Sequence, residues 1–114
     1  MTRSFDMEFE KALKEIEKEY KFRWVNKTCV QIDSEQMLDA NNYCFVDVLN
    51  KNGQALLTDF AEHMQIVTLK EDKVKEICKK HNLTWNNYHL ECAYEGNQDI
   101  KNYFACLAEI AENM

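Results

Sequence analysis

The sequence predicts an α+β domain in which an antiparallel sheet of about four strands carries helices mainly on one face. Two apolar runs flank Asn52-Gly53, and both of these residues tolerate the positive φ angles that a tight hairpin turn requires. Apolar residues also recur at helical spacing near each end of the chain. The 114 residues contain no proline, two glycines and no low-complexity segment, so we expect a single domain over residues 1–114.

The N-terminal part of the chain is expected to form a helix over residues 1–21, ahead of a sheet-and-helix core over residues 22–114. The apolar positions of this helix recur every three or four residues: Phe5, Phe9, Leu13, Ile16 and Tyr20. Residues 22–32 are rich in β-branched and aromatic side chains and predict a first strand. Residues 34–42 are polar and predict a turn.

Residues 43–49 are apolar on both alternating sets of positions, which is typical of a strand covered on two sides. Residues 54–58 are expected to return antiparallel. Asp59, followed by Glu62, then matches a helix start, and predicts a short helix to about residue 65. Thr68 and Glu71 repeat this capping pattern before a helix that ends in positive residues at 79–81.

Residues 88–94 alternate between apolar and polar side chains, which predicts a half-buried strand near an edge of the sheet. Asn97 is the expected cap of a final helix. Its apolar stripe is Ile100, Tyr103, Phe104, Leu107, Ile110, Ala111 and Met114. The predicted order of elements is α-β-β-β-α-α-β-α.

The amino-acid composition limits the classes of protein to which this chain can belong. Charged residues make up 30% and apolar residues 46% of the chain, a globular balance, and no apolar run approaches the roughly 18 residues of a membrane span. The first residues lack the apolar core of a secretion signal, so we expect a cytoplasmic protein. An odd number of irregularly spaced cysteines predicts reduced, buried thiols. They are Cys29, Cys44, Cys78, Cys92 and Cys106.

The net charge of −6 argues against a direct nucleic-acid binder, because Lys and Arg supply most of such affinity. Residues 59–72 and 83–114 are acidic in excess, around a positive island at 73–81. Two interpretations stay open: these are solvated helix faces that keep the protein soluble, or they form an acidic face for a basic partner.

No residues form a recognisable catalytic set. The cysteines and histidines select no nucleophile–base pair, and two isolated glycines cannot build a phosphate-binding loop. Asp59, Glu62 and His63 could serve general acid–base chemistry, but helix capping also explains the two carboxylates. We therefore predict a non-enzymatic protein with no catalytic residue, no cofactor and no metal.

Two alternatives remain. Cys78 and His81, with His89 and Cys92, provide the nitrogen and sulfur ligands that zinc prefers, so a small metal-binding regulator is possible if they converge. In a strand, however, positions 89 and 92 point to opposite faces. A divalent-metal hydrolase or nuclease would instead use the carboxylates of Asp47 and Asp59.

The run over residues 43–60, followed by a helix, a strand and a terminal helix, resembles a small prophage-encoded domain-of-unknown-function family of low-GC bacteria. The resemblance covers about residues 24–114. Its motif is Leu56-Leu57-Thr58-Asp59, preceded by the turn Asn52-Gly53. That family commonly has a glycine two residues after the aspartate, where this chain has Ala61. No catalytic residues are assigned to that family, so none is carried over.

The resemblance implies a phage or mobile-element source, and small acidic proteins of such elements often block a host defence nuclease. We therefore expect an interaction protein of the anti-CRISPR type, a monomer or homodimer, that binds a basic protein surface and neither nucleic acid nor membrane directly. The residues expected to contact this partner are Asp59, Glu62, Glu71, Asp72, Trp85, Tyr88, Glu91 and Glu95.

Overall fold

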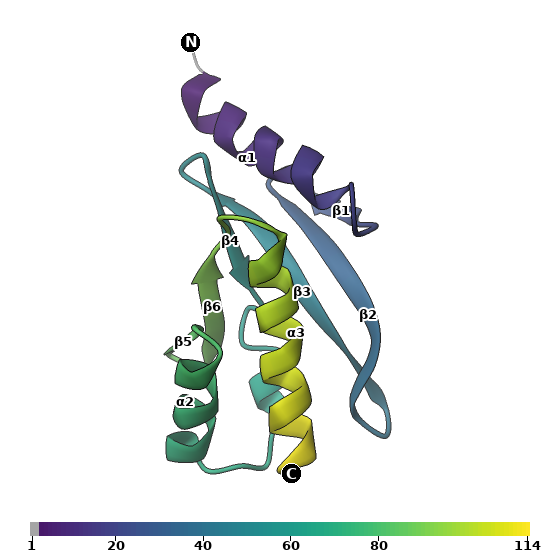
Figure 1. Ribbon diagram of the computed structural model, residues 1–114, viewed down its shortest axis with the longest axis vertical. Coiled ribbons are helices and arrows are strands. Elements are labelled where there is room, and N and C mark those ends of the chain that lie inside the picture. The colour runs from purple at the N-terminus through teal and green to yellow at the C-terminus, as the bar shows by residue number, and fades with distance from the viewer. Residues whose placement is uncertain (1–2) are drawn as a thin grey trace.

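A computed structural model describes residues 3–114, with the side chains of residues 8–114. In this part of the chain, six strands form one antiparallel sheet of order β1-β2-β3-β4-β6-β5, and three α-helices accompany it (Figure 1). The elements are α1 (Arg3–Ile16), β1 (Arg23–Asn26), β2 (Cys29–Asp39), β3 (Asn42–Lys51), β4 (Gln54–Thr58), the 3-10 helix η1 (His63–Gln65), α2 (Glu71–Lys80), β5 (Thr84–Asn86), β6 (His89–Ala93) and α3 (Asn97–Glu112). The α+β class and the antiparallel sheet are as predicted, but the sheet has six strands instead of about four.

The N-terminal half of the sheet corrects two predictions. Residues 22–32 form two strands, because a turn at 27–28 separates β1 from β2 and Asn26 Oδ1 accepts the Thr28 N–H at 2.8 Å. The polar segment at 34–42 is mostly strand, because its polar side chains alternate toward solvent along β2. Gln36 Nε2 also donates to the Phe104 carbonyl at 2.9 Å, which ties this stretch to α3.

Two hairpin turns use residues with positive φ. Asn52 and Gly53 have φ of 54° and 86°, which confirms the predicted turn between β3 and β4. Asn87 and Tyr88 have φ of 51° and 72° between β5 and β6. The sequence did not predict this second hairpin, because β5 has three residues and its turn lacks glycine.

The predicted helix starts also change. Residues 59–65 form a turn that ends in η1, without an α-helix. Helix α2 begins at Glu71, and its N-cap Lys70 makes no side-chain capping bond, so Thr68 is not a cap. Gly96 is the N-cap of α3, where Asp99 Oδ2 accepts the N–H groups of Glu95 and Gly96. Asn97 is instead the first helical residue.

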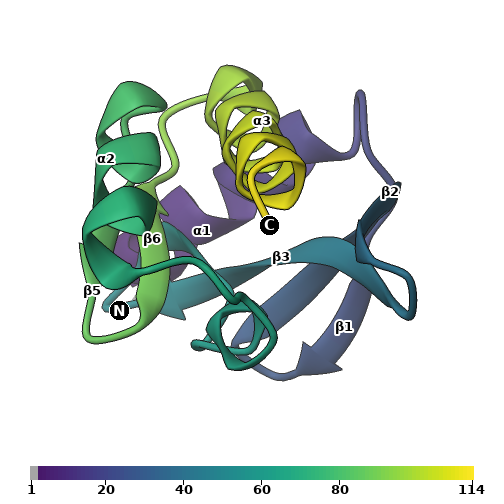
Figure 2. The ribbon, with the colours of Figure 1, turned by 90° about the horizontal axis from the view of Figure 1, so that it is seen from below.

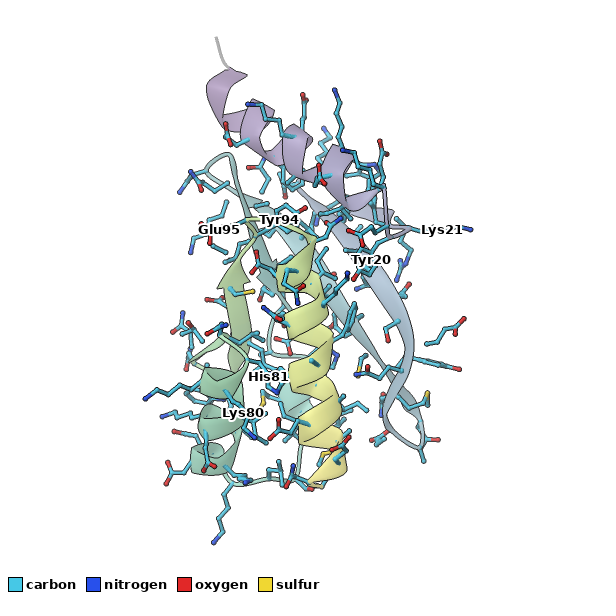
Figure 3. All side chains as sticks on the ribbon, in the orientation of Figure 1. Tyr20, Lys21, Lys80, His81, Tyr94 and Glu95 are labelled. Carbon is cyan, nitrogen blue, oxygen red and sulfur yellow. The ribbon has the colours of Figure 1, made fainter. Side chains whose placement is uncertain are left out.

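The helices cover one face of the sheet. Helix α1 packs on β4, α3 crosses β2 and β3, and α2 packs against α3 and β5. Most of the predicted stripes are buried there: Phe9, Leu13 and Ile16 in α1, and Ile100, Tyr103, Leu107 and Ile110 in α3. The first helix ends at Ile16, short of the predicted residue 21, so Tyr20 lies beyond it, and Met114 follows α3 and is 39% exposed. The side chain of Phe5 lies outside the described part. Figure 3 shows Lys80 and His81 beside α3, where both contact the Glu109 carboxylate and lower its pKa.

The opposite face, called here the open face, carries none of the α-helices that residues 3–114 form. Figure 2 shows α2 and α3 on one side of the sheet and the turn that contains η1 on the other. We call residues 59–66 the 59–66 segment. No helix in residues 3–114 is long and apolar enough to cross a membrane. The five cysteines are free, and four are buried, as predicted; Cys92 is partly buried.

Candidate functional site

The open face is organised around the point where β4 ends. Strand β4 stops at Thr58, while its neighbours β3 and β6 continue. At this level the Phe45 N–H of β3 donates to His63 Nε2 at 3.3 Å, and the Leu90 N–H of β6 donates to Asp59 Oδ1 at 3.2 Å. His63 Nδ1 and Asp59 Oδ2 are joined at 2.8 Å. The Asp59–His63 pair therefore takes the place of the missing strand.

This pair is fully occupied by its structural role. Asp59 is 0% exposed and His63 is 2% exposed. Asp59 Oδ1 accepts a second hydrogen bond, from the Ala61 N–H at 3.0 Å, so that three donors surround the carboxylate. Both ring nitrogens of His63 are used, one as a donor and one as an acceptor, which corresponds to the neutral ring. The general acid–base alternative would require these bonds to break.

A polar row crosses all six strands on the open face. Cross-strand pairing places its members side by side in the order Arg23, Gln31, Asp47, Thr58, Glu91 and Thr84. Arg23 Nη2 donates to Gln31 Oε1, and Gln31 Nε2 donates to Asp47 Oδ1 at 2.9 Å. Asp47 is 4% exposed. Burial raises its pKa to about 6 against the opposing Gln31 hydrogen bond, and the negative charges of Glu62 and Asp59 add to the rise.

Exposed aromatic side chains lie on the 59–66 segment and on both sides of it. Tyr43, Phe60 and Tyr88 are 62%, 43% and 53% exposed. Phe60 and Tyr88 also have positive φ, of 51° and 72°, which is an unfavourable conformation for bulky residues. Strained residues of this kind persist where the surrounding structure enforces them, often at functional sites. We call Tyr43, Phe60 and Tyr88 the aromatic rim.

The structure brings together three of the residues predicted to contact a partner. Glu62 and Tyr88 are exposed beside η1, and Glu91 is partly exposed on the open face. Trp85 lies behind the rim, with Lys75 Nζ 4.7 Å from its ring centroid and the Tyr88 ring 5.0 Å away. Asp59 was predicted to contact a partner, but its carboxylate is buried and offers no surface.

The other predicted residues lie elsewhere. Glu71 and Asp72 are in the first turn of α2, where Glu71 pairs with Lys75 at 2.8 Å. Glu95 follows β6 near α1, at the opposite end from Lys80 and His81 (Figure 3). The predicted acidic contacts therefore do not form one continuous surface.

The residues named for the two metal-site alternatives are not arranged as a metal site requires. His89 and Cys92 lie on opposite faces of β6, while Cys78 Sγ contacts Cys106 Sγ at 4.0 Å and His81 Nε2 contacts Glu109. Among the side chains of residues 8–114, no three of His, Cys, Asp and Glu are placed to hold a metal ion. Burial raises the pKa of the Cys92 thiol to about 12, which disfavours the thiolate that binds metals.

Three residues of this site, Tyr43, Phe60 and His63, are missing from the predicted partner contacts. Phe60 directly follows Asp59, and a large aromatic side chain in a predicted helix start was the available signal. His63 was noted beside the carboxylates, but its contact with Phe45 of β3 depends on tertiary structure. Comparison with known proteins gives no matching family model, no matching curated protein and no matching solved structure. The site is therefore interpreted from its own geometry and chemistry.

Proposed function

We propose that this protein binds another protein through the open face, with the aromatic rim as the anchor and Glu62 and Glu91 as charged contacts. The observation that carries this proposal is the rim itself. Three large aromatic side chains, one on the 59–66 segment and two beside it, stay exposed, and two of the three do so in an unfavourable backbone conformation. Tyrosine and other aromatic residues are enriched at the centres of protein interfaces.

The concave shape of this region supports the proposal. Three hollows border the 59–66 segment, with volumes of about 460, 300 and 300 Å³. Phe60 lines the first, Glu62 the second and Tyr88 the third. Convex side chains of a partner could enter such hollows, and this kind of complementarity distinguishes a specific interface from a flat surface.

The charge of the protein indicates the kind of partner. The net charge is −6, and the open face adds Asp47, Glu62 and Glu91 to the rim. A basic protein surface would complement this field and speed association. Because of the resemblance to a prophage family, we propose a bacterial defence nuclease, such as a CRISPR effector, as the first partner to test.

The backbone at residue 61 lies in the left-handed region, which glycine favours. Ala61 stands where the family commonly has glycine, and its φ is 68°. Glycine adopts this conformation without the steric cost that Ala61 bears.

The test is inhibition of DNA cleavage by purified CRISPR effector nucleases, in the presence of the purified protein. The proposal expects inhibition of at least one effector, which Tyr43→Ala or Phe60→Ala weakens by about tenfold or more. Asp72→Ala, on α2, is the control and should inhibit like the wild type. Inhibition that both rim variants retain in full would contradict the proposed surface, and absence of inhibition and of binding to every effector would contradict the proposed partner.

A further inference from the structure

The hollow between β3 and the 59–66 segment has the chemistry to recognise one particular side chain. We propose that it takes the guanidinium group of an arginine from the partner protein, with Glu62 as the ion-pairing carboxylate and Tyr43 as the stacking surface. This inference rests on the proposed function and names the contact by which the open face recognises a basic partner. We call the hollow the Tyr43–Glu62 pocket.

The aromatic wall of the pocket comes from β3. Tyr43 and Phe45 are two residues apart and lie on the open face, and both line the pocket. The His63 ring covers Phe45, with ring centroids 4.4 Å apart, whereas Tyr43 remains 62% exposed. A guanidinium group is planar and weakly hydrated, so it stacks on such a ring more readily than an ammonium group does.

The charge in the pocket is of one sign. Glu62 is the single charged side chain among the described residues that line it, and none of the described side chains forms an ion pair with Glu62. Asp47 and Asp59 add negative charge close by. Burial is the main cause of the raised pKa of Asp47, and the charges of Glu62 and Asp59 raise it further. The cation nearest along the polar row, Arg23, already contacts Asp33 at 3.4 Å and Gln31. The pocket therefore presents an acidic group with no cation of its own.

A second acidic hollow on the protein differs from the Tyr43–Glu62 pocket and can serve as its control. It lies between α1 and the end of β6, has a volume of about 430 Å³ and contains Glu8, Glu15 and Glu95. Lys11 also lines it and lies 3.7 Å from Glu8. Its aromatic residue, Tyr94, donates its hydroxyl to Asn97 Oδ1 at 2.7 Å. This hollow is acidic but has an internal cation, and so it serves as the control.

The size of the Tyr43–Glu62 pocket suits a side chain. Its volume of about 300 Å³ stands at the lower limit of small-molecule sites, which hold larger ligands. Asn42 and Gln65 at its edge provide amide groups for further hydrogen bonds.

The experiment is an NMR titration of the isotope-labelled protein with N-acetyl-arginine amide. We expect saturable shift changes in the backbone amides of Tyr43, Phe45, Glu62 and Gln65. Glu62→Gln should weaken binding by about tenfold or more, because it removes the charge and keeps the shape, whereas Glu95→Gln should change it by less than about twofold. Tyr43→Ala should also weaken binding. N-acetyl-citrulline amide, the neutral counterpart of the ligand, should bind at least about tenfold more weakly.

The inference is overturned if Glu62→Gln binds arginine amide like the wild type, if citrulline amide binds equally well, or if the shifts map to the hollow at Glu95. Tighter binding of N-acetyl-lysine amide would also contradict it, because stacking on Tyr43 favours the planar group. The titration needs no partner protein, so its failure leaves the nuclease test intact. If the pocket binds arginine amide but the protein neither binds nor inhibits any effector nuclease, the proposed function alone is contradicted.

Discussion

The same strands carry different chemistry on the two faces of the sheet. Toward the helices, Val46, Leu57 and Leu90 are fully buried among apolar side chains. The next residue of each strand lies on the open face, and these residues are Asp47, Thr58 and Glu91. Apolar burial stabilises the fold, whereas burial of a carboxylate such as Asp47 opposes it. The comparison indicates that the helical face accounts for stability and that the open face retains groups that stability alone does not favour.

The largest expected effect separates neighbouring leucines of β4. Leu57 is fully buried under the helices and Leu56 is partly exposed on the open face. Leu57→Ala should lower the free energy of unfolding by about 4 kcal/mol, because it leaves a cavity in the core. Leu56→Ala should cost about 1 kcal/mol or less, since water can fill the space. Urea unfolding measures both, and equal losses would contradict the division between the faces.

The Asp59–His63 pair should show that the open face also has a structural part. Asp59→Ala leaves the N–H groups of Ala61 and Leu90 and the His63 ring without their acceptor. We expect a loss of about 3 kcal/mol in the free energy of unfolding. Asp72→Ala, which removes an exposed carboxylate, should cost less than about 1 kcal/mol. A loss at Asp59 no larger than at Asp72 would show that the 59–66 segment does not depend on this network.

The pH dependence of stability should show how much the buried Asp47 carboxylate lowers the free energy of unfolding. Its pKa is raised to about 6 from the ordinary 3.8, so the folded protein binds the proton more tightly than the unfolded chain. Lowering the pH from 6 toward 3.8 therefore stabilises the fold, and that gain is lost as the pH rises through about 6. Asp47→Asn should stabilise the protein by about 1 to 3 kcal/mol at pH 8 and hardly at all at pH 4. Urea unfolding at the two pH values is the test, and a variant less stable at pH 8 would contradict it.

The smallest effect concerns the strain in the 59–66 segment. Ala61 has a φ of 68°, which glycine tolerates better than alanine. Ala61→Gly should raise the free energy of unfolding by about 0.5 to 1 kcal/mol. Ala105→Gly, at an exposed position of α3, should instead lower it by about 1 kcal/mol. If both glycine variants lose stability alike, the strain at Ala61 is not significant.

Local patterns predicted much of the fold. The stripes of α1 and α3 and the Asn52-Gly53 hairpin follow from periodicity and turn chemistry, and the structure has all three. The polar part of β2 was missed because it extends past the short strand β1, where a strand segment can be polar when its pairing with β3 and the contact of Gln36 with α3 hold it. The short strand β5 gave too few residues for a pattern.

The candidate site was less predictable, because it depends on contacts between distant segments. Asp59 and Glu62 were noted as acidic residues in one turn, but one is buried and the other exposed. What separates them is the end of β4, which leaves the N–H groups of Phe45 and Leu90 for Asp59 and His63 to accept. Neither the composition nor the residue spacing of the sequence predicts that β4 ends before β3 and β6 do.

The central claim is that recognition belongs to the open face, and two charge reversals test it most directly. Glu62→Lys and Glu71→Lys change the net charge equally, one beside the aromatic rim and one on α2. The measurement is calorimetric binding of an oligo-arginine peptide to each variant at one ionic strength. We predict that Glu62→Lys weakens binding by about tenfold or more and Glu71→Lys by less than about threefold. Equal weakening by the two variants would mean that net charge alone attracts the peptide, and would contradict the account.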